Sequence, residues 1–245
     1  MPNAIITGGS RGLGLALARA LAVRGWSLVL DARGETTLRQ AAEELRTHTT
    51  VAALAGDVAD PWHRAALIDI AGEPIDLLVN NASALGPSPQ PALADYPLAE
   101  LAEVYRVNVL APLALVQLAL PRLSPGACIL NVTSDAAVEP YEGWGGYGSS
   151  KAALDQLSAI LGAERPDLRV YAVDPGDMRT QMHQDAFPGQ DISDRPLPER
   201  SVPGLLELIE GEWDSGRYVA RELADAAGHT GQAGEPALTG SELGR

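Results

Sequence analysis

A tyrosine and a lysine lie four residues apart in the stretch Tyr147-Gly148-Ser149-Ser150-Lys151. On a helix this spacing places both side chains on one face, one turn apart. An ammonium group close to a phenol favours the phenolate, so the pKa of the tyrosine falls and it can exchange a proton with a substrate oxygen near neutral pH. Lys151 is the only lysine of the chain. The same spacing also occurs by chance in many helices, so its meaning depends on the other motifs.

A glycine-rich turn is the second pattern that could serve chemistry. Gly8, Gly12 and Gly14 follow a short apolar strand and open a segment with helical spacing, in the order G-x-x-x-G-x-G. Glycines at this place let the backbone approach a pyrophosphate group at the N-terminus of the helix. Glycine turns between strands and helices are frequent, so this turn needs the surrounding fold as support.

The elements that would position these motifs alternate regularly along the chain. We expect strands at residues 3–7, 26–30, 51–55, 75–79, 127–132, 168–173 and 216–220, and helices at residues 15–24, 35–46, 61–71, 98–120, 147–163 and 202–209. Strands that alternate with helices form parallel sheets, because each crossover returns the chain to the same edge. The pattern predicts an α/β fold, a single Rossmann-type doubly wound parallel sheet with helices on both faces.

The composition narrows the classes of function. The chain has 245 residues, 46% of them hydrophobic, which suits one soluble α/β domain. Its net charge of -14 argues against nucleic acids and anionic membranes as partners. A single cysteine, Cys128, is typical of a reducing compartment. Since we also find no N-terminal signal and no clean membrane-spanning run, we expect a cytoplasmic protein.

Three segments define the expected organisation. Residues 1–222 would form the dinucleotide-binding and catalytic domain, with a long substrate loop at about 177–203, and residues 223–245 would form a flexible tail. The segment Val107–Leu120 is almost entirely apolar, so a helix there must be covered on all sides. Either another helix of the same chain or a second copy could cover it, and we expect a homodimer or homotetramer.

Five separated motifs occur along the chain in this order: Thr7-Gly-x-x-x-Gly12-x-Gly14, Asn80-Asn81-Ala82, Ser134, Tyr147-x-x-x-Lys151 and Pro175-Gly176. Over residues 1 to about 220 this order resembles the classical short-chain dehydrogenase/reductase family, and the closing stretch is similar to its small carbonyl-reductase-like members.

The resemblance implies a role for each catalytic candidate. Tyr147 would be the general acid in carbonyl reduction and the base in alcohol oxidation, and Lys151 would lower its pKa and bind the nicotinamide ribose. Ser134 would hydrogen-bond the substrate oxygen, and Asn108 would hold a water that connects Lys151 to solvent.

The resemblance also implies a cofactor site. Its residues would be Gly8, Ser10, Arg11, Gly12, Leu13, Gly14, Ala32, Arg33, Asp57, Val58, Asn80, Ala82, Tyr147, Lys151, Pro175, Gly176, Met178 and Thr180. One departure is Ser83, which stands where the family usually has glycine.

The choice between NADP and NAD depends on the end of the second strand. Asp31 looks like the acid that binds a ribose 2′-hydroxyl, but counting from Gly14 places the family's acidic position at Ala32. Arg33 follows directly, and Arg11 lies in the glycine turn. Two guanidinium groups suit a 2′-phosphate, so we predict NADP(H) in preference to NAD(H).

These observations predict an NADP(H)-dependent oxidoreductase that interconverts a carbonyl and an alcohol on a small-molecule substrate. Tyr141, Trp144 and Met182 are candidates for an apolar wall of the substrate site. The four histidines show no metal-ligand spacing, so we expect no metal. Two alternatives remain: a sensor or regulator that binds NADP without chemistry, and an epimerase or dehydratase of the same family.

Overall fold

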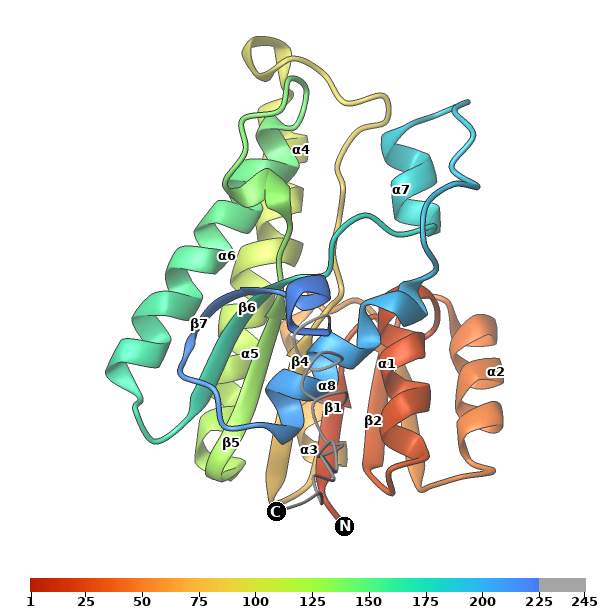
Figure 1. Cartoon of the computed structure of the whole chain (residues 1–245), viewed down its shortest axis with the longest axis vertical. Coiled ribbons are helices and arrows are strands. Elements are labelled where there is room, and N and C mark those ends of the chain that lie inside the picture. The colour runs from red at the N-terminus through yellow and green to blue at the C-terminus, as the bar shows by residue number, and fades with distance from the viewer. Residues whose placement is uncertain (225–245) are drawn as a thin grey trace, which may run out of the picture.

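The computed structural model describes residues 1–224 of the chain. Its strands form one sheet in the order β3-β2-β1-β4-β5-β6-β7, and every neighbouring pair is parallel (Figure 1). The strands are β1 Asn3–Ile6, β2 Ser27–Ala32, β3 Val51–Ala55, β4 Ile75–Asn80, β5 Leu123–Val132, β6 Arg169–Asp174 and β7 Gly216–Val219. This confirms the predicted doubly wound parallel sheet.

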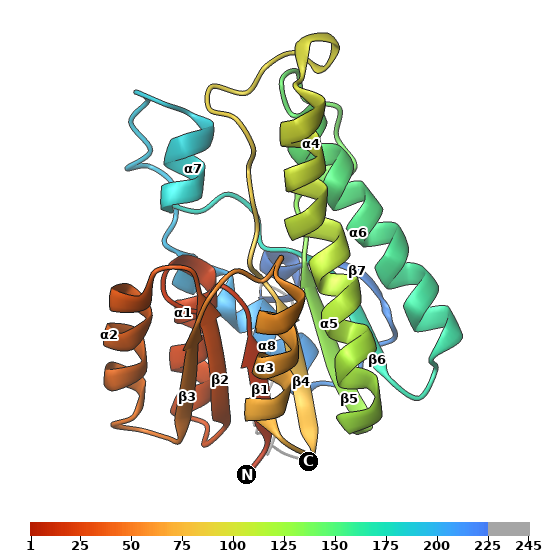
Figure 2. The same ribbon diagram turned by 180° about the vertical axis from the view of Figure 1, so that it is seen from behind.

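Helices cover both faces of the sheet. They are α1 Gly12–Ala22, α2 Glu35–Leu45, α3 Pro61–Ala71, α4 Leu98–Tyr105, α5 Ala111–Ala119, α6 Gly145–Glu164, α7 Gln181–Ala186 and α8 Val202–Glu210. Helices α1, α2 and α8 lie on one face, and α3 to α6 lie on the other, as the view from behind shows (Figure 2). The short α7 stands beyond the edge at which the strands end.

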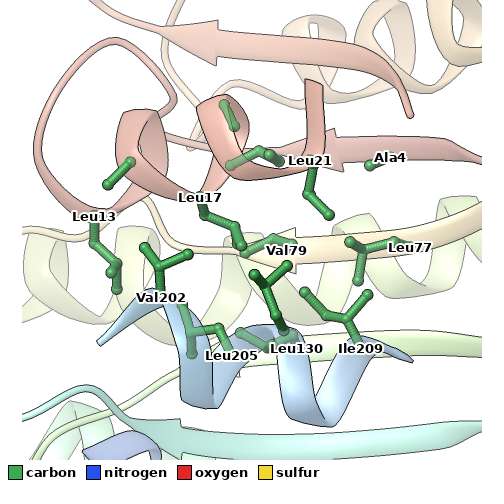
Figure 3. Packing of buried hydrophobic residues seen from close by; sticks show 14 of the residues in the cluster. Ala4, Leu13, Leu17, Leu21, Leu77, Val79, Leu130, Val202, Leu205 and Ile209 are labelled. Carbon is green, nitrogen blue, oxygen red and sulfur yellow. The ribbon is translucent and has the colours of Figure 1, made fainter. Parts of the chain in front are cut away.

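The alternation of side chains along each strand builds a separate core on each face. On one face Leu17 and Leu21 of α1 and Leu205 of α8 belong to a single buried cluster above the sheet (Figure 3). On the other face Ile5 of β1 clusters with Leu115 of α5. Burying each such leucine or isoleucine contributes about 2 kcal/mol, so the sheet is held firmly between the two helix layers.

The strand order places the functional motifs together. The chain starts at the central β1, moves outward to β3, and returns to pair β4 with β1 on the other side. In such sheets ligands bind at the carboxyl ends of the strands, where the order reverses. The loops after β1, β4, β5 and β6 carry four of the five sequence motifs, so those motifs meet at this edge.

The helix expected at 98–120 is interrupted by a π-helical turn at Arg106–Leu110, which separates α4 from α5. The helical stretch Leu98–Arg122 is long and apolar enough to cross a membrane by length and composition. Its inward side chains, such as Ala111 and Leu115, belong to the core beneath the sheet, so we interpret it as a core helix. Leu98 and Leu110 remain exposed.

One helix and one segment boundary differ from the prediction. The substrate loop contains α7, which is too short to show a clear period and is capped by Thr180, whose Oγ1 accepts from the backbone N–H of His183 (3.2 Å). Residues 220–224 are helical, and Leu223 is buried in the core, so residue 222 does not end the folded part. The rest of the predicted tail, 225–245, lies outside the described residues.

Candidate active site

A cavity of about 770 Å³ opens at the carboxyl edge of the sheet. This volume is in the upper part of the range for small-molecule and cofactor sites. Most predicted site residues line it: Gly8, Ser10, Arg11, Gly12, Leu13, Ala32, Arg33, Asp57, Val58, Ala82, Ser134, Trp144, Tyr147, Lys151, Pro175, Gly176, Met178, Thr180 and Met182. The structure therefore brings the five motifs to one site.

The glycine turn is built for close backbone approach. Gly8 and Gly12 have φ of 66° and 57°, in the left-handed region that favours glycine. Helix α1 begins at Gly12, three residues earlier than expected, so its free backbone N–H groups reach the cavity. Gly14 does not line the cavity: a Cβ there would lie 2.5 Å from the carbonyl oxygen of Gly8. Gly14 thus lets the helix pack on the turn.

The carboxylate of Asp31 binds the glycine turn through a hydrogen bond. Its Oδ1 accepts from the backbone N–H of Gly8 (2.8 Å), and its Oδ2 lies 3.1 Å from Nε2 of His63. The carboxylate is therefore occupied, and only 1% of the residue is exposed. Ala32 and Arg33 follow it along the cavity wall, as counting from Gly14 predicts.

The two asparagines after β4 have different roles. Asn80, a predicted cofactor contact, does not line the cavity: it is buried and donates from Nδ2 to Oδ1 of Asn131 (2.7 Å). Asn81 lines the cavity instead and donates from Nδ2 to the carbonyl oxygen of Thr7 (2.8 Å). The sequence motif pointed to both positions, but only the tertiary contacts distinguish them.

Tyr147 and Lys151 lie on one face of α6, as their spacing predicts. Both are buried, and Nζ of Lys151 lies 5.5 Å from the centroid of the Tyr147 ring. The ammonium group donates to the carbonyl oxygen of Val132 (2.8 Å), which fixes it against the end of β5. The pair is therefore assembled where the cavity opens.

The expected fall in the pKa of Tyr147 is wrong for this structure. Burial raises the pKa of Tyr147 well above its usual value, and the hydroxyl groups of Ser83 and Ser134 oppose that rise only in part. Burial also lowers the pKa of Lys151 to about 8, which Asp155 opposes. The sequence shows a neighbouring charge but not the depth of burial, and burial dominates here. The phenol consequently keeps its proton at neutral pH.

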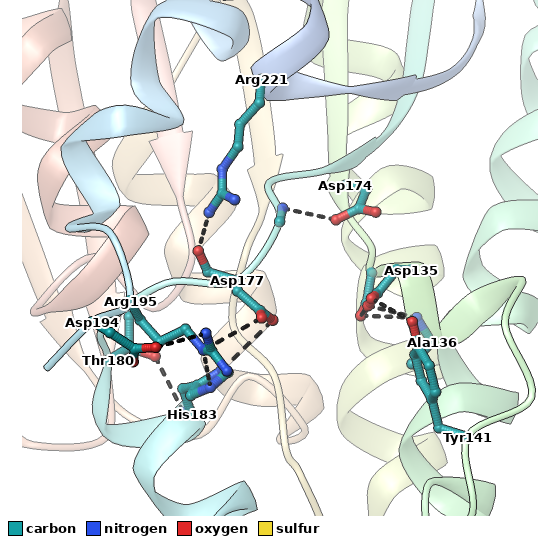
Figure 4. A network of polar contacts seen from close by, with 12 residues as sticks. Asp135, Ala136, Tyr141, Asp174, Asp177, Thr180, His183, Asp194, Arg195 and Arg221 are labelled. Atoms are coloured by element: carbon teal, nitrogen blue, oxygen red, sulfur yellow. Dashed lines mark hydrogen bonds and ion pairs between the residues drawn. The ribbon is translucent and has the colours of Figure 1, made fainter. Parts of the chain in front are cut away.

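Ser134 is oriented by the next residue. Its Oγ donates to Oδ1 of Asp135 (2.8 Å) and accepts from the backbone N–H of Ala136 (3.2 Å), so it also caps a short turn. The Tyr141 hydroxyl donates to Oδ2 of the same carboxylate (3.0 Å; Figure 4). Tyr141, a predicted substrate contact, is exposed and does not line the cavity.

Asn108 lies in the π-helical turn and is completely buried. Its Oδ1 accepts from Oγ of Ser83 (3.0 Å) and from the N–H of Ala84 (2.8 Å), and its Nδ2 donates to the carbonyl oxygen of Ala84 (2.9 Å) and to Oγ of Ser150 (2.9 Å). All its side-chain hydrogen-bonding capacity is used. The amide therefore joins the loop after β4 to α6, and the role of Asn108 in holding a water stays a prediction.

The far wall of the cavity comes from the segment that carries α7. Asp177 there lies 3.5 Å from Nε of Arg195 and 3.8 Å from Nδ1 of His183 (Figure 4). Trp144 stacks edge-on with Tyr147 and packs on Phe187, with centroid distances of 5.7 and 5.9 Å. This end of the cavity is thus apolar with a polar rim. Within residues 1–224 no group of three His, Cys, Asp or Glu side chains could hold a metal.

Comparison with known proteins places the chain in a family. Residues 2–191 match the family model described as short chain dehydrogenase. Sepiapterin reductase from Mus musculus is 35% identical over 197 residues, which cover 74% of this chain and 76% of that protein. Sulfoacetaldehyde reductase 2 from Chromohalobacter salexigens is 36% identical over 185 residues, which cover 72% and 73%.

Solved structures agree. A short chain dehydrogenase from Shigella flexneri, in complex with NADP, aligns with a TM-score of 0.82 and 26% identity over 90% of this chain and 97% of that chain. The sheet, the glycine turn and these matches define an oxidoreductase with a Rossmann-type fold. Within that class, the chain belongs to the short-chain dehydrogenase/reductase family.

Proposed function

We propose that this protein is an NADP(H)-dependent oxidoreductase that interconverts a carbonyl and an alcohol, with Tyr147 as the general acid and base. The observation that carries the proposal is the buried pair of Tyr147 and Lys151 in the cavity that also contains the glycine turn. A bound nicotinamide would supply or accept the hydride.

The residues around the cavity fit a phosphorylated dinucleotide. The N-terminus of α1 and the glycine turn offer backbone N–H groups to a pyrophosphate. Arg11 and Arg33 line the cavity, and neither forms an ion pair within residues 1–224. Asp31 near the end of β2 is held by Gly8 and His63, so both of its carboxylate oxygens are already engaged. This arrangement favours NADP(H) over NAD(H).

Side chains of the protein would then carry out the proton transfer. Tyr147 holds a proton at neutral pH and donates it to the oxygen of a carbonyl as that oxygen gains negative charge. Ser134 stands beside the phenol and stabilises the same oxygen once its hydroxyl turns from Asp135. Lys151 stabilises the phenolate that remains.

We further propose that the substrate is a neutral carbonyl compound with an apolar group. Leu85, Trp144 and Met182 supply an apolar wall beside Tyr147. The carboxylates of Asp135 and Asp177 also line the cavity, and the hydrogen bond to Asp135, followed by its charge, raises the pKa of Tyr141. An anionic substrate would meet like charge there.

The experiment compares NADPH oxidation with methyl 4-formylbenzoate and with 4-carboxybenzaldehyde, which differ in charge but share the reacting group. We expect the neutral ester to have a kcat/KM about tenfold higher, because two carboxylates repel the acid at short range. Asp135→Asn, which removes one charge and keeps the shape, should narrow that ratio.

Sepiapterin and sulfoacetaldehyde extend this comparison to compounds named for relatives. A preference for the carboxylate or for sulfoacetaldehyde would refute the proposed substrate class. Tight NADPH binding without turnover of any of these carbonyls would favour the sensor instead.

We also propose a homo-oligomer, because Leu110 and Leu118 on the helix behind the sheet remain 56% and 39% exposed in the single chain. A second copy could cover them. Light scattering should give at least a dimer mass, and Leu110→Glu should shift it toward the monomer. A monomer mass for the unmodified protein would refute this.

A further inference from the structure

Asp31 and His63 form a buried pair beside the proposed cofactor site. The side chains of His63 and Asp31 are only 6% and 2% exposed, and Nε2 of the imidazole lies 3.1 Å from Oδ2 of the carboxylate. A carboxylate oxygen can only accept a hydrogen bond, so Nε2 carries the proton. The proposed proton transfer does not use His63, and this contact is therefore open to another role.

The alternation of side chains along β2 explains which way Asp31 points. Val29 packs in the cluster that includes residues of α3, whereas Leu30 and Ala32 pack in the cluster on the other face of the sheet. Asp31 therefore points to the face that α3 covers, and His63 on α3 reaches it there. Ala32, at the family's acidic position, points to the opposite face.

The carboxylate of Asp31 is held by one donor from each of two segments. Its Oδ1 accepts from the backbone N–H of Gly8 in the glycine turn (2.8 Å), and its Oδ2 accepts from His63. The imidazole of His63 packs against Gly56, where a Cβ would collide with the ring. The absence of a side chain at Gly56 thus leaves room for His63 beside Asp31.

We propose that His63 is a positioning residue that sets the preference for NADP(H), because it keeps the Asp31 carboxylate bound on the side of α3. This inference rests on the proposed function and deepens it. His63 does not line the cavity, whereas Asp31 does. His63 therefore acts on the cofactor through Asp31 and not by contact.

The loss of the imidazole would change what Asp31 does. Its Oδ2 would become a buried acceptor without a donor, and such a group favours any new partner within reach. The guanidinium groups of Arg33 and Arg11 line the same cavity, and a ribose 2′-hydroxyl would be a further donor. A bond to an arginine would compete with the 2′-phosphate, and a bond to the hydroxyl would favour NAD(H). The unbound carboxylate would also repel the phosphate.

The direct test measures binding and does not need turnover. The Kd values of NADPH and NADH, followed by cofactor fluorescence, give the ratio of affinities for the two cofactors. His63→Leu should shift that ratio toward NADH about tenfold, as expected for one hydrogen bond to a charged group. His63→Gln is the conservative variant, because its amide can still donate to Oδ2, and it should keep most of the ratio. Should His63→Leu not fold, His63→Asn, whose shorter amide takes the place of Nδ1, gives the same comparison.

A double-mutant cycle tests whether His63 acts through Asp31. Asp31→Asn removes the charge and keeps an oxygen for the N–H of Gly8, so it should retain the preference for NADPH. In that background His63→Leu should change the ratio little. Leu67→Val is the control for stability: Leu67 is buried one turn further along α3 and does not line the cavity. It should lower the melting temperature and leave the ratio unchanged.

A ratio that is unchanged in folded His63→Leu would overturn the inference. A tenfold shift that persists in the Asp31→Asn background would also overturn it, because His63 would then act by another route. If the unmodified protein shows no preference for NADPH, the proposed cofactor fails. A further shift toward NADH in His63→Leu would even then support the role of His63, and its absence would refute that role.

Discussion

Replacing Tyr147 by phenylalanine is expected to lower kcat for carbonyl reduction about 1,000-fold, within the range for loss of a general acid. The change removes only the hydroxyl of a buried ring, so the packing against Trp144 and the position of Lys151 should persist. The measurement is NADPH oxidation under saturating methyl 4-formylbenzoate. Binding of NADPH, followed by its fluorescence, should change little.

The pH dependence provides a second check on the same residue. Because burial raises the pKa of Tyr147, the phenol is protonated at neutral pH. Reduction in the unmodified protein should therefore hold through neutral pH and into the mildly alkaline range. Alcohol oxidation needs the deprotonated phenol and should rise over the same range. A Tyr147→Phe protein that keeps more than about one tenth of the activity would refute its role as the proton donor.

The second large effect concerns the cofactor. Arg33→Asp is expected to raise KM for NADPH about 100-fold, because the variant loses a charge-assisted hydrogen bond and places a carboxylate near the 2′-phosphate. KM for NADH should change far less, since NADH carries a hydroxyl there. The measurement is initial rates with each cofactor at a fixed carbonyl concentration.

Arg39→Asp is the matched control for this prediction. Arg39 is also an exposed arginine and lies on α2, which begins two residues after Arg33, but it does not line the cavity. It reports the effect of the same change in net charge, which should be small and equal for both cofactors. Equal increases in KM for NADPH and NADH in Arg33→Asp would refute the assignment.

The periodic patterns were sufficient to predict the sheet and most element positions. Helix α3 has the expected bounds, Pro61–Ala71, because a proline and a capping aspartate mark its start. The same reading placed Tyr147 and Lys151 on one face of α6, since that depends only on helical spacing. Capping residues and helical spacing depend on neighbouring residues only, so tertiary contacts do not change what they predict.

Features that depend on distant contacts could not be predicted. The bond between Asp31 and the glycine turn, and the four bonds of Asn108, join segments far apart in the sequence. The pKa of Tyr147 depends on burial, which the sequence does not show. Helix α7 was missed because six residues are too few for a 3.6-residue period to emerge.

Helix α7 lies beyond the sheet edge (Figure 2), so the residues that would select the substrate and those that would transfer the proton come from different segments. Lys151 is anchored to the end of β5 through Val132, whereas Met182, which packs in the cluster beside Tyr147, comes from α7. An exchange of residues 178–197 with those of a relative would replace Met182 and its neighbours at the substrate end of the cavity. It would leave Tyr147 and Lys151 unchanged on α6. Substrate selectivity could thus be altered by exchanging one segment, without changing the proposed catalytic residues.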